Sequence, residues 1–151
     1  MSPDLIAFDL DAAPTHREDF IAWYRDAARR VGPVDRAVMT PELIGFYDAM
    51  RATFPPMSGP DATPVDAPRG LIDRLLFRKA VPADPSCLAE YGFSGAAVHV
   101  RFARQMVRTA MASGLVAAKE LGLGVFDART QGGAILRDPY EIDDMLVLLA
   151  A

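Results

Sequence analysis

Four side chains in the second half of the chain have types and spacings that could form one chemical site. His99 and Arg101 alternate with apolar residues in one stretch, and Asp127 ends a later apolar stretch. A histidine oriented by a carboxylate can act as a general base. If the two stretches are neighbouring strands, His99, Arg101 and Asp127 lie together with Tyr91. A solvated sheet face with one cross-strand pair is the simpler interpretation of these residues, and we favour it.

Two short motifs resemble catalytic loops, but each lacks something that its loop requires. Asp9 and Asp11 follow an apolar run, as in the nucleophile loop of haloacid-dehalogenase-type phosphatases, where one acid attacks phosphorus and the other protonates the leaving group. Ala13 stands where those enzymes carry threonine or valine. Residues 92–95 (Gly-Phe-Ser-Gly) are similar to the turn that exposes a nucleophilic serine, but they precede a strand, whereas that turn follows one. We interpret the first motif as strand-end carboxylates and the second as a turn.

The residues that commonly bind metals and cofactors are sparse in this sequence. His16, His99 and Cys87 are too far apart to match a zinc spacing, and the acidic residues do not follow a calcium-loop pattern. The glycines of 122–124 follow a predicted helix, so they cannot hold a phosphate in the way of a dinucleotide-binding loop. The sequence therefore predicts no metal, no cofactor and no catalytic residue.

Aromatic residues cluster in two stretches of the first half of the chain. Trp23 and Tyr24 lie in one predicted helix, and Phe46 and Tyr47 lie in the next. Packing between the two helices is the interpretation that we favour. An exposed subset would instead mark a partner surface, because aromatic residues are enriched at interfaces. In that alternative, Trp23, Tyr24 and Tyr47 form the surface.

A predicted strand–helix–strand unit over residues 96–128 contains His99, Arg101 and Asp127 and sets their positions. Residues 96–103 alternate between apolar and polar side chains, which is typical of a half-buried strand. Residues 105–121 show helical spacing with many small side chains, and Gly122 is placed as a C-terminal cap. The next strand begins at Val125, and the two glycines at 132–133 predict a hairpin turn into 134–136.

Clear start and stop signals predict three further helices and a first strand. Residues 5–10 form a short apolar strand, and Thr15 with Glu18 makes a capping box for the helix that follows. Thr40 and Pro41 begin a second helix, which the two prolines at 55–56 end. An extended loop covers 55–70. For 71–80 the spacing fits a helix, which we favour, and a buried strand over residues 75–77 is the alternative. Asp138, Pro139 and Glu141 begin a terminal helix over 139–150.

Composition places the chain among globular α+β proteins of one domain, covering residues 1–151. About half of the residues are apolar and the formal net charge is −4, which is ordinary for a globular protein and disfavours nucleic acid as a partner. We expect a small, mostly antiparallel sheet with two to four packed helices. One cysteine and no apolar run of ~20 residues favour a cytoplasmic protein without a membrane partner or an export signal.

Several stretches together resemble a family of small bacterial cytosolic proteins of unknown function. They are Ala7-Phe8, Ala12-Ala13-Pro14, Ala22-Trp23-Tyr24, residues 40–43 and 54–60, Tyr91, and residues 98–103 and 122–127. The resemblance covers most of the chain except 61–88, where this sequence is longer. It departs from the family pattern at Ser58, where asparagine is usual, and at Arg104, where a polar or aromatic residue is usual. The resemblance implies no activity and no site residue.

The sequence predicts a non-catalytic protein-binding domain. The acidic charge would favour a basic protein partner by electrostatic steering, as for an immunity protein or an antitoxin-like inhibitor. The alternative is a small enzyme or small-molecule binder that uses the face of His99, Arg101 and Asp127. A third hypothesis is a homo-oligomer that assembles through the terminal helix 139–150.

Overall fold

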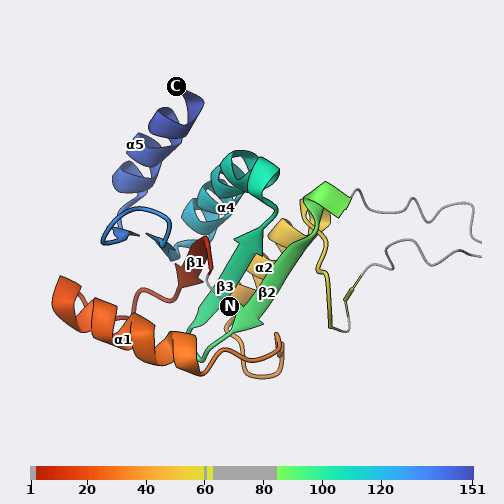
Figure 1. The fold of residues 1–151 in the computed structure, drawn as a ribbon. Helices are drawn as coiled ribbons and strands as arrows, with labels where there is room; N and C mark the ends of the chain where they lie inside the picture. The colour runs from red at the N-terminus through yellow and green to blue at the C-terminus, as the bar shows by residue number, and fades with distance from the viewer. Residues whose placement is uncertain (1–2, 60, 63–84) are drawn as a thin grey trace, which may run out of the picture.

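A five-stranded antiparallel sheet lies at the centre of the protein, for which a computed structural model describes residues 3–59, 61–62 and 85–151 (Figure 1). The strands are β1 (Leu5–Phe8), β2 (Ala89–Phe93), β3 (Ala97–Phe102), β4 (Gly124–Asp127) and β5 (Ala134–Leu136). Their order across the sheet is β2-β3-β1-β4-β5, and every neighbouring pair is antiparallel. The expected α+β fold with a mostly antiparallel sheet is confirmed.

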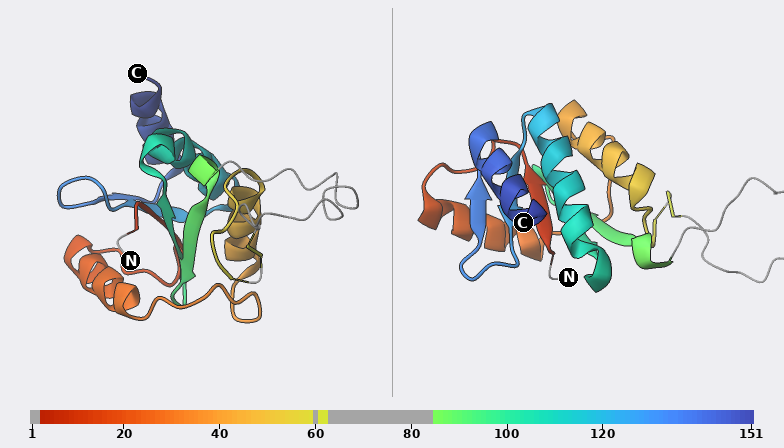
Figure 2. Two further views of the ribbon diagram at one scale, coloured as in Figure 1. Left: turned by 45° about the vertical axis from the view of Figure 1, so that its right-hand side comes forward. Right: turned by 90° about the horizontal axis from the view of Figure 1, so that it is seen from above.

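Helices cover both faces of this sheet (Figure 2). The α-helices are α1 (Arg17–Arg29), α2 (Pro41–Thr53), α4 (Val107–Leu121) and α5 (Pro139–Ala150), and the short 3-10 turns are η1 (Pro85–Cys87) and η2 (Arg104–Met106). The larger core joins α2, α4 and α5 to one face, and a smaller aromatic core joins α1 to the other.

Strand β1 contributes to both cores because successive side chains of a strand point to opposite faces. Leu5 and Ala7 belong to the larger core, whereas Ile6 and Phe8 belong to the smaller one. The strand predicted at 96–103 is present, but the prediction that one of its faces is solvated is wrong, because α1 packs on that face. His99 on β3 is therefore 1% exposed rather than solvated.

The predicted strand–helix–strand unit is formed by β3, α4 and β4. Both strands pair antiparallel with β1, which lies between them, so they run in the same direction without touching. Gly122 ends α4 with a φ of 69°, the left-handed conformation that glycine adopts without strain. The predicted hairpin from β4 to β5 is also confirmed.

The helix-start signals differ in outcome. The Thr40 side chain accepts from the Leu43 amide 3.3 Å away, and Asp138 with Glu141 forms a complete capping box. The capping box predicted at Thr15 is wrong, because α1 begins after His16 and has no side-chain cap. The Arg17 guanidinium at this helix start donates instead to the carbonyls of residues 132 and 133, in the β4–β5 turn.

Strand β2 was absent from the predicted elements. Its sequence, Ala-Glu-Tyr-Gly-Phe, contains three residue types that are depleted in strands. The turn predicted at 92–95 is confirmed, since the chain reverses between β2 and β3 around Gly95, whose φ is 64°. Most of the loop predicted for 55–70 and the helix favoured for 71–80 lie outside the described residues.

Candidate functional site

The sheet separates the four residues that the sequence suggested as one chemical site. His99 is paired with Ile6 and Asp127 with Leu5, so their side chains leave opposite faces of the sheet. Tyr91 is paired with Val100, which places it on the face opposite to His99. The expected cluster required β3 and β4 to be neighbours, and β1 between them prevents it.

The partner of His99 is a serine rather than a carboxylate. The Nε2 of His99 lies 2.5 Å from the Oγ of Ser94, which is 8% exposed in the β2–β3 turn. Its Nδ1 is buried and has no hydrogen-bond partner among the described residues. Burial lowers the pKa of His99 to about 4, so the ring is neutral at physiological pH.

The Ser94–His99 pair contains the atoms of a nucleophile and its base but lacks the rest of a hydrolase site. Within the described parts of the chain no carboxylate orients the Nδ1 of His99, and both side chains are withdrawn from solvent. The arrangement instead fastens the turn, since the Ser94 amide also donates to the Ala97 carbonyl at 3.0 Å. Sequence analysis missed this pair because it needs the strand register, in which Gly92 is opposite His99.

Asp127 holds the beginning of the β4–β5 turn. Its carboxylate accepts from the Arg129 amide at 3.0 Å and from two guanidinium nitrogens of Arg129 at 3.0 and 3.1 Å. Its own carbonyl accepts from the Thr130 hydroxyl at 3.3 Å. All of these contacts lie within residues 127–130. Asp127 is buried, and its carboxylate stabilises the turn.

Arg101 is the exposed member of the predicted group. Its guanidinium lies 3.7 Å from the carboxylate of Glu90 on β2, which is the cross-strand ion pair of the simpler interpretation. With Arg104 and Asp4 the pair lines a cleft of about 380 Å³. Since its four charged residues are two of each sign, the cleft has no evident preference for cations or anions.

The aromatic residues considered as a partner surface pack inward. The centroid of the Trp23 ring lies 6.0 Å from that of Phe8 and 5.4 Å from that of Phe20. The ring centroids of Tyr24 and Phe126 are 4.8 Å apart. Tyr47 is buried in the larger core. These three residues therefore serve the two cores, as in the interpretation that we favoured, although α1 and α2 lie on opposite faces rather than against each other.

Of the six exposed large apolar residues in the described part of the chain, three lie on the outer side of α5, and the other three are Val38, Met57 and Val116. Tyr140 is 78% exposed, Val147 69% and Leu148 68%. Their spacing of seven and eight residues places them on one side of the helix, together with the exposed Asp144. We call these four residues the α5 face.

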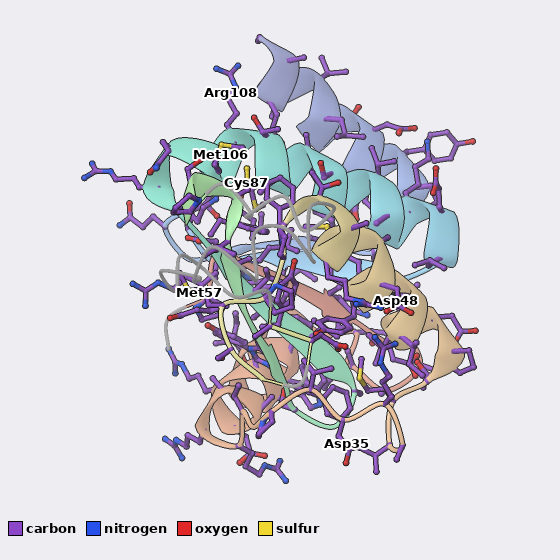
Figure 3. All side chains as sticks on the ribbon, turned by 90° about the vertical axis from the view of Figure 1, so that its right-hand side faces the viewer. Asp35, Asp48, Met57, Cys87, Met106 and Arg108 are labelled. Carbon is purple, nitrogen blue, oxygen red and sulfur yellow. The ribbon has the colours of Figure 1, made fainter. Side chains whose placement is uncertain are left out.

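The opposite side of α5 attaches the helix to the larger core. Ile142 is fully buried, and Met145, Leu146 and Leu149 pack against the core. Lys119 on α4 binds Asp143 at 2.7 Å (Nζ to Oδ1). Arg108 on α4 donates to the carbonyls of Leu149, at 2.6 Å, and Ala151 (Figure 3).

The α5 face could have been found in the sequence. Residues 145–150 (Met-Leu-Val-Leu-Leu-Ala) are all apolar. In a surface helix with one buried side, by contrast, apolar residues recur every three or four positions and polar residues stand between them. A helix that is apolar on every side must expose some of those side chains unless it is fully enclosed. The same helix carries no basic residue, since 138–151 contains four carboxylates and no lysine or arginine.

No family model matches this chain, and no curated protein or solved structure is significantly similar to it. Over the described residues, none of the helices has both the length and the apolar character that crossing a membrane requires. The same part of the chain contains no group of three or more His, Cys, Asp or Glu side chains placed to hold a metal ion.

Proposed function

We propose that this protein is a protein-binding domain that contacts a basic partner through the α5 face. The observation that carries the proposal is the exposure of Tyr140, Val147 and Leu148 on one side of a helix whose other side is anchored. Large apolar side chains grouped on a surface favour burial against another molecule. Burying a side chain of this size stabilises a complex by roughly 1.5–3 kcal/mol.

The charge around this face supports a basic partner. Glu141, Asp143 and Asp144 lie on α5, and Asp138 caps it. Of these, Asp143 is bound to Lys119, and the Arg108 guanidinium lies at the end of the helix, so the four carboxylates and these two cations leave two negative charges for steering. Opposite charge on a partner raises the rate of encounter and selects against acidic surfaces.

An immunity protein or antitoxin-like inhibitor is the form of this function that we favour. Such a protein acts by covering the working surface of its target, which needs a stable contact face and no catalytic group of its own. The small size and acidic charge of the chain support this form. A cytoplasmic location is part of the same proposal.

The two other hypotheses have less support. Assembly of two copies through α5 would bring two sets of carboxylates together, which is unfavourable. An enzyme or small-molecule site built on His99, Arg101 and Asp127 would need these residues on a shared face, and they lie on two faces.

A photo-crosslinking amino acid at position 140 tests the proposal in the cells that make this protein. The matched control places the same amino acid at Val38, an apolar residue that is 64% exposed in the loop before α2. We expect position 140 to capture one basic protein in a one-to-one adduct and position 38 not to capture it. Equal capture from both positions, or none from position 140, contradicts the proposal. An adduct of twice the chain mass shows a second copy instead.

A further inference from the structure

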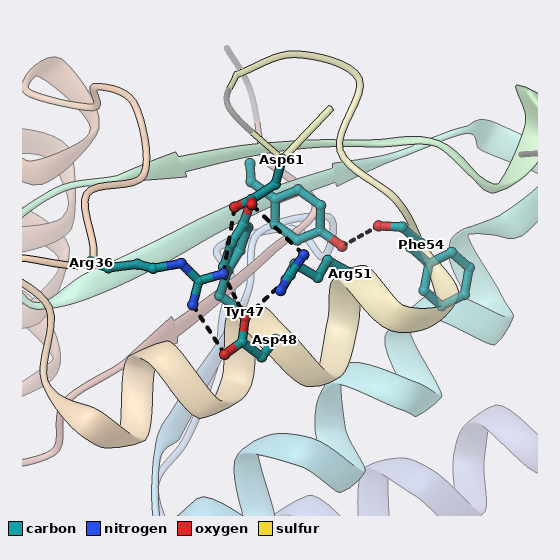
Figure 4. Close-up of polar contacts among 7 residues, drawn as sticks. Arg36, Tyr47, Asp48, Arg51, Phe54 and Asp61 are labelled. Atoms are coloured by element: carbon teal, nitrogen blue, oxygen red, sulfur yellow. Dashed lines mark hydrogen bonds and ion pairs between the residues drawn. The ribbon is translucent and has the colours of Figure 1, made fainter. Parts of the chain in front are cut away.

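A charged cluster on α2 is separate from the α5 face and is not used by the function proposed above (Figure 4). Its centre is Asp48, which accepts from two guanidinium nitrogens of Arg36 at 2.7 and 3.0 Å. The Nε of Arg51 donates to the same carboxylate at 2.9 Å. Asp48 thus fixes both arginines in place, and these hydrogen bonds lower the pKa of its carboxyl.

A second carboxylate, Asp61, lies where three donor groups meet. The Tyr47 hydroxyl donates to its Oδ2 at 3.0 Å, and the NH2 of Arg36 lies 3.5 Å from the same oxygen. The NH1 of Arg51 lies 3.8 Å from the other oxygen, Oδ1. Each oxygen of the Asp61 carboxylate therefore faces at least one arginine.

The tyrosine donor is held in place independently of Asp61. The Tyr47 ring is buried and meets the Tyr91 ring edge-on at 5.1 Å, and the Tyr91 hydroxyl donates to the Phe54 carbonyl at 2.6 Å. The guanidinium carbons of Arg36 and Arg51 lie 5.3 and 5.9 Å from the centre of the Tyr47 ring. Burial and the bond to Asp61 raise the pKa of Tyr47 to about 12, so its hydroxyl remains a donor at neutral pH.

Charge makes this donor set selective for an anion. The two arginines and Asp48 together carry one positive charge, which Asp61 neutralises. We propose that Arg36, Tyr47 and Arg51 form a carboxylate-binding site whose resident ligand is Asp61, and that a free carboxylate takes its place when that side chain is removed. In the wild-type protein the site is self-occupied, so an acidic ligand competes with Asp61 for it.

Chemical rescue of an Asp61→Ala variant by formate or acetate tests the proposal. The readout is the melting temperature in sodium formate, sodium acetate and sodium chloride at equal ionic strength. We expect both carboxylates to raise the melting temperature of the variant in a saturable way, by about 2–4 °C more than chloride does. For the wild type and for Asp26→Ala, which removes an exposed acid paired with the single arginine Arg30, the saturable difference between formate and chloride should be absent.

A Tyr47→Phe change in the Asp61→Ala background removes one donor and should weaken the rescue. Asp61→Ser, whose short side chain leaves the position of the carboxylate open, replaces Asp61→Ala if the alanine variant does not fold. For Asp61→Ser, saturable shifts of the Arg36 and Arg51 side-chain NMR signals with formate are the expected result. Equal effects of formate and chloride on the Asp61 variants would overturn the proposal. A saturable sulfate effect that is larger than that of formate and is seen in the variant but not in the wild type would also overturn it, because the site would then be one for tetrahedral anions.

Discussion

The hydroxyl of Ser94 and the ring of His99 meet in the interior, with Oγ 2.5 Å from Nε2, on the two sides of the β2–β3 turn. Replacing Ser94 by alanine leaves both ring nitrogens buried without a partner among the described residues. Such a loss costs about 1–3 kcal/mol. We expect Ser94→Ala to lower the free energy of unfolding in urea by this amount. Ser58→Ala, at an exposed position, should change it little, and equal effects of the two changes would contradict the structural role of the pair.

Stability should fall in mild acid because of His99. Its folded-state pKa of about 4 lies below the ordinary histidine pKa of 6.5, so the unfolded chain binds the proton first as the pH falls. The neutral ring therefore makes its full contribution to the free energy of unfolding above about pH 6.5. That contribution is lost as the pH falls from 6.5 to 4. The difference between the two pKa values corresponds to a loss of at most about 3 kcal/mol in the free energy of unfolding.

The measurement is the pH dependence of urea unfolding for the wild type, His99→Gln and His16→Gln. His99→Gln should flatten the slope between pH 6.5 and 4, whereas His16→Gln, at an exposed position, should leave it unchanged. A wild-type slope that survives in His99→Gln would mean that another group is responsible.

The β4–β5 turn should depend on Asp127. Replacing it by alanine removes the acceptor of the Arg129 amide and guanidinium, and hydrogen bonds to charged groups contribute about 1.5–3 kcal/mol. We expect a loss of stability of about 2 kcal/mol and faster hydrogen exchange over residues 127–136. Asp144→Ala serves as the control. Unchanged exchange in this turn would contradict the role assigned to Asp127.

The attachment of α5 should depend on Arg108. Its guanidinium donates to carbonyls at the end of α5, where the last turn of a helix has no internal partners. Replacing Arg108 by alanine should therefore raise hydrogen exchange in residues 145–151 and weaken capture of a partner by the α5 face. Arg104→Ala, an exposed arginine that lines the separate cleft near Glu90, is the control. If exchange at the end of α5 is the same in both variants, Arg108 does not anchor the helix.

Most features of this fold that depend on neighbouring residues were predictable from the sequence, although the equally local capping box at Thr15 does not form. The caps at Thr40 and Asp138 and the glycine end of α4 each require only a few adjacent positions. Strand order is different, because it depends on which strands pair at a distance. The insertion of β1 between β3 and β4 separates His99 from Asp127, and no spacing along the chain encodes it.

The same limit explains why the candidate surface was misplaced. Trp23 and Tyr24 have the chemistry of interface residues, but α1 turns them toward a sheet face that the alternating pattern of β3 suggested was solvated. The apolar run of α5 was visible in the sequence, yet which of its sides stays exposed depends on its packing against α4.

The affinity of the captured partner for variants of the α5 face tests the central proposal most directly. With the partner purified, calorimetric titration of Tyr140→Ala/Leu148→Ala should show a dissociation constant raised about tenfold or more, because truncating a central aromatic contact typically costs over 1 kcal/mol. The control Val38→Ala should match the wild type, and added salt should weaken wild-type binding. An unchanged dissociation constant in the double variant would contradict the account.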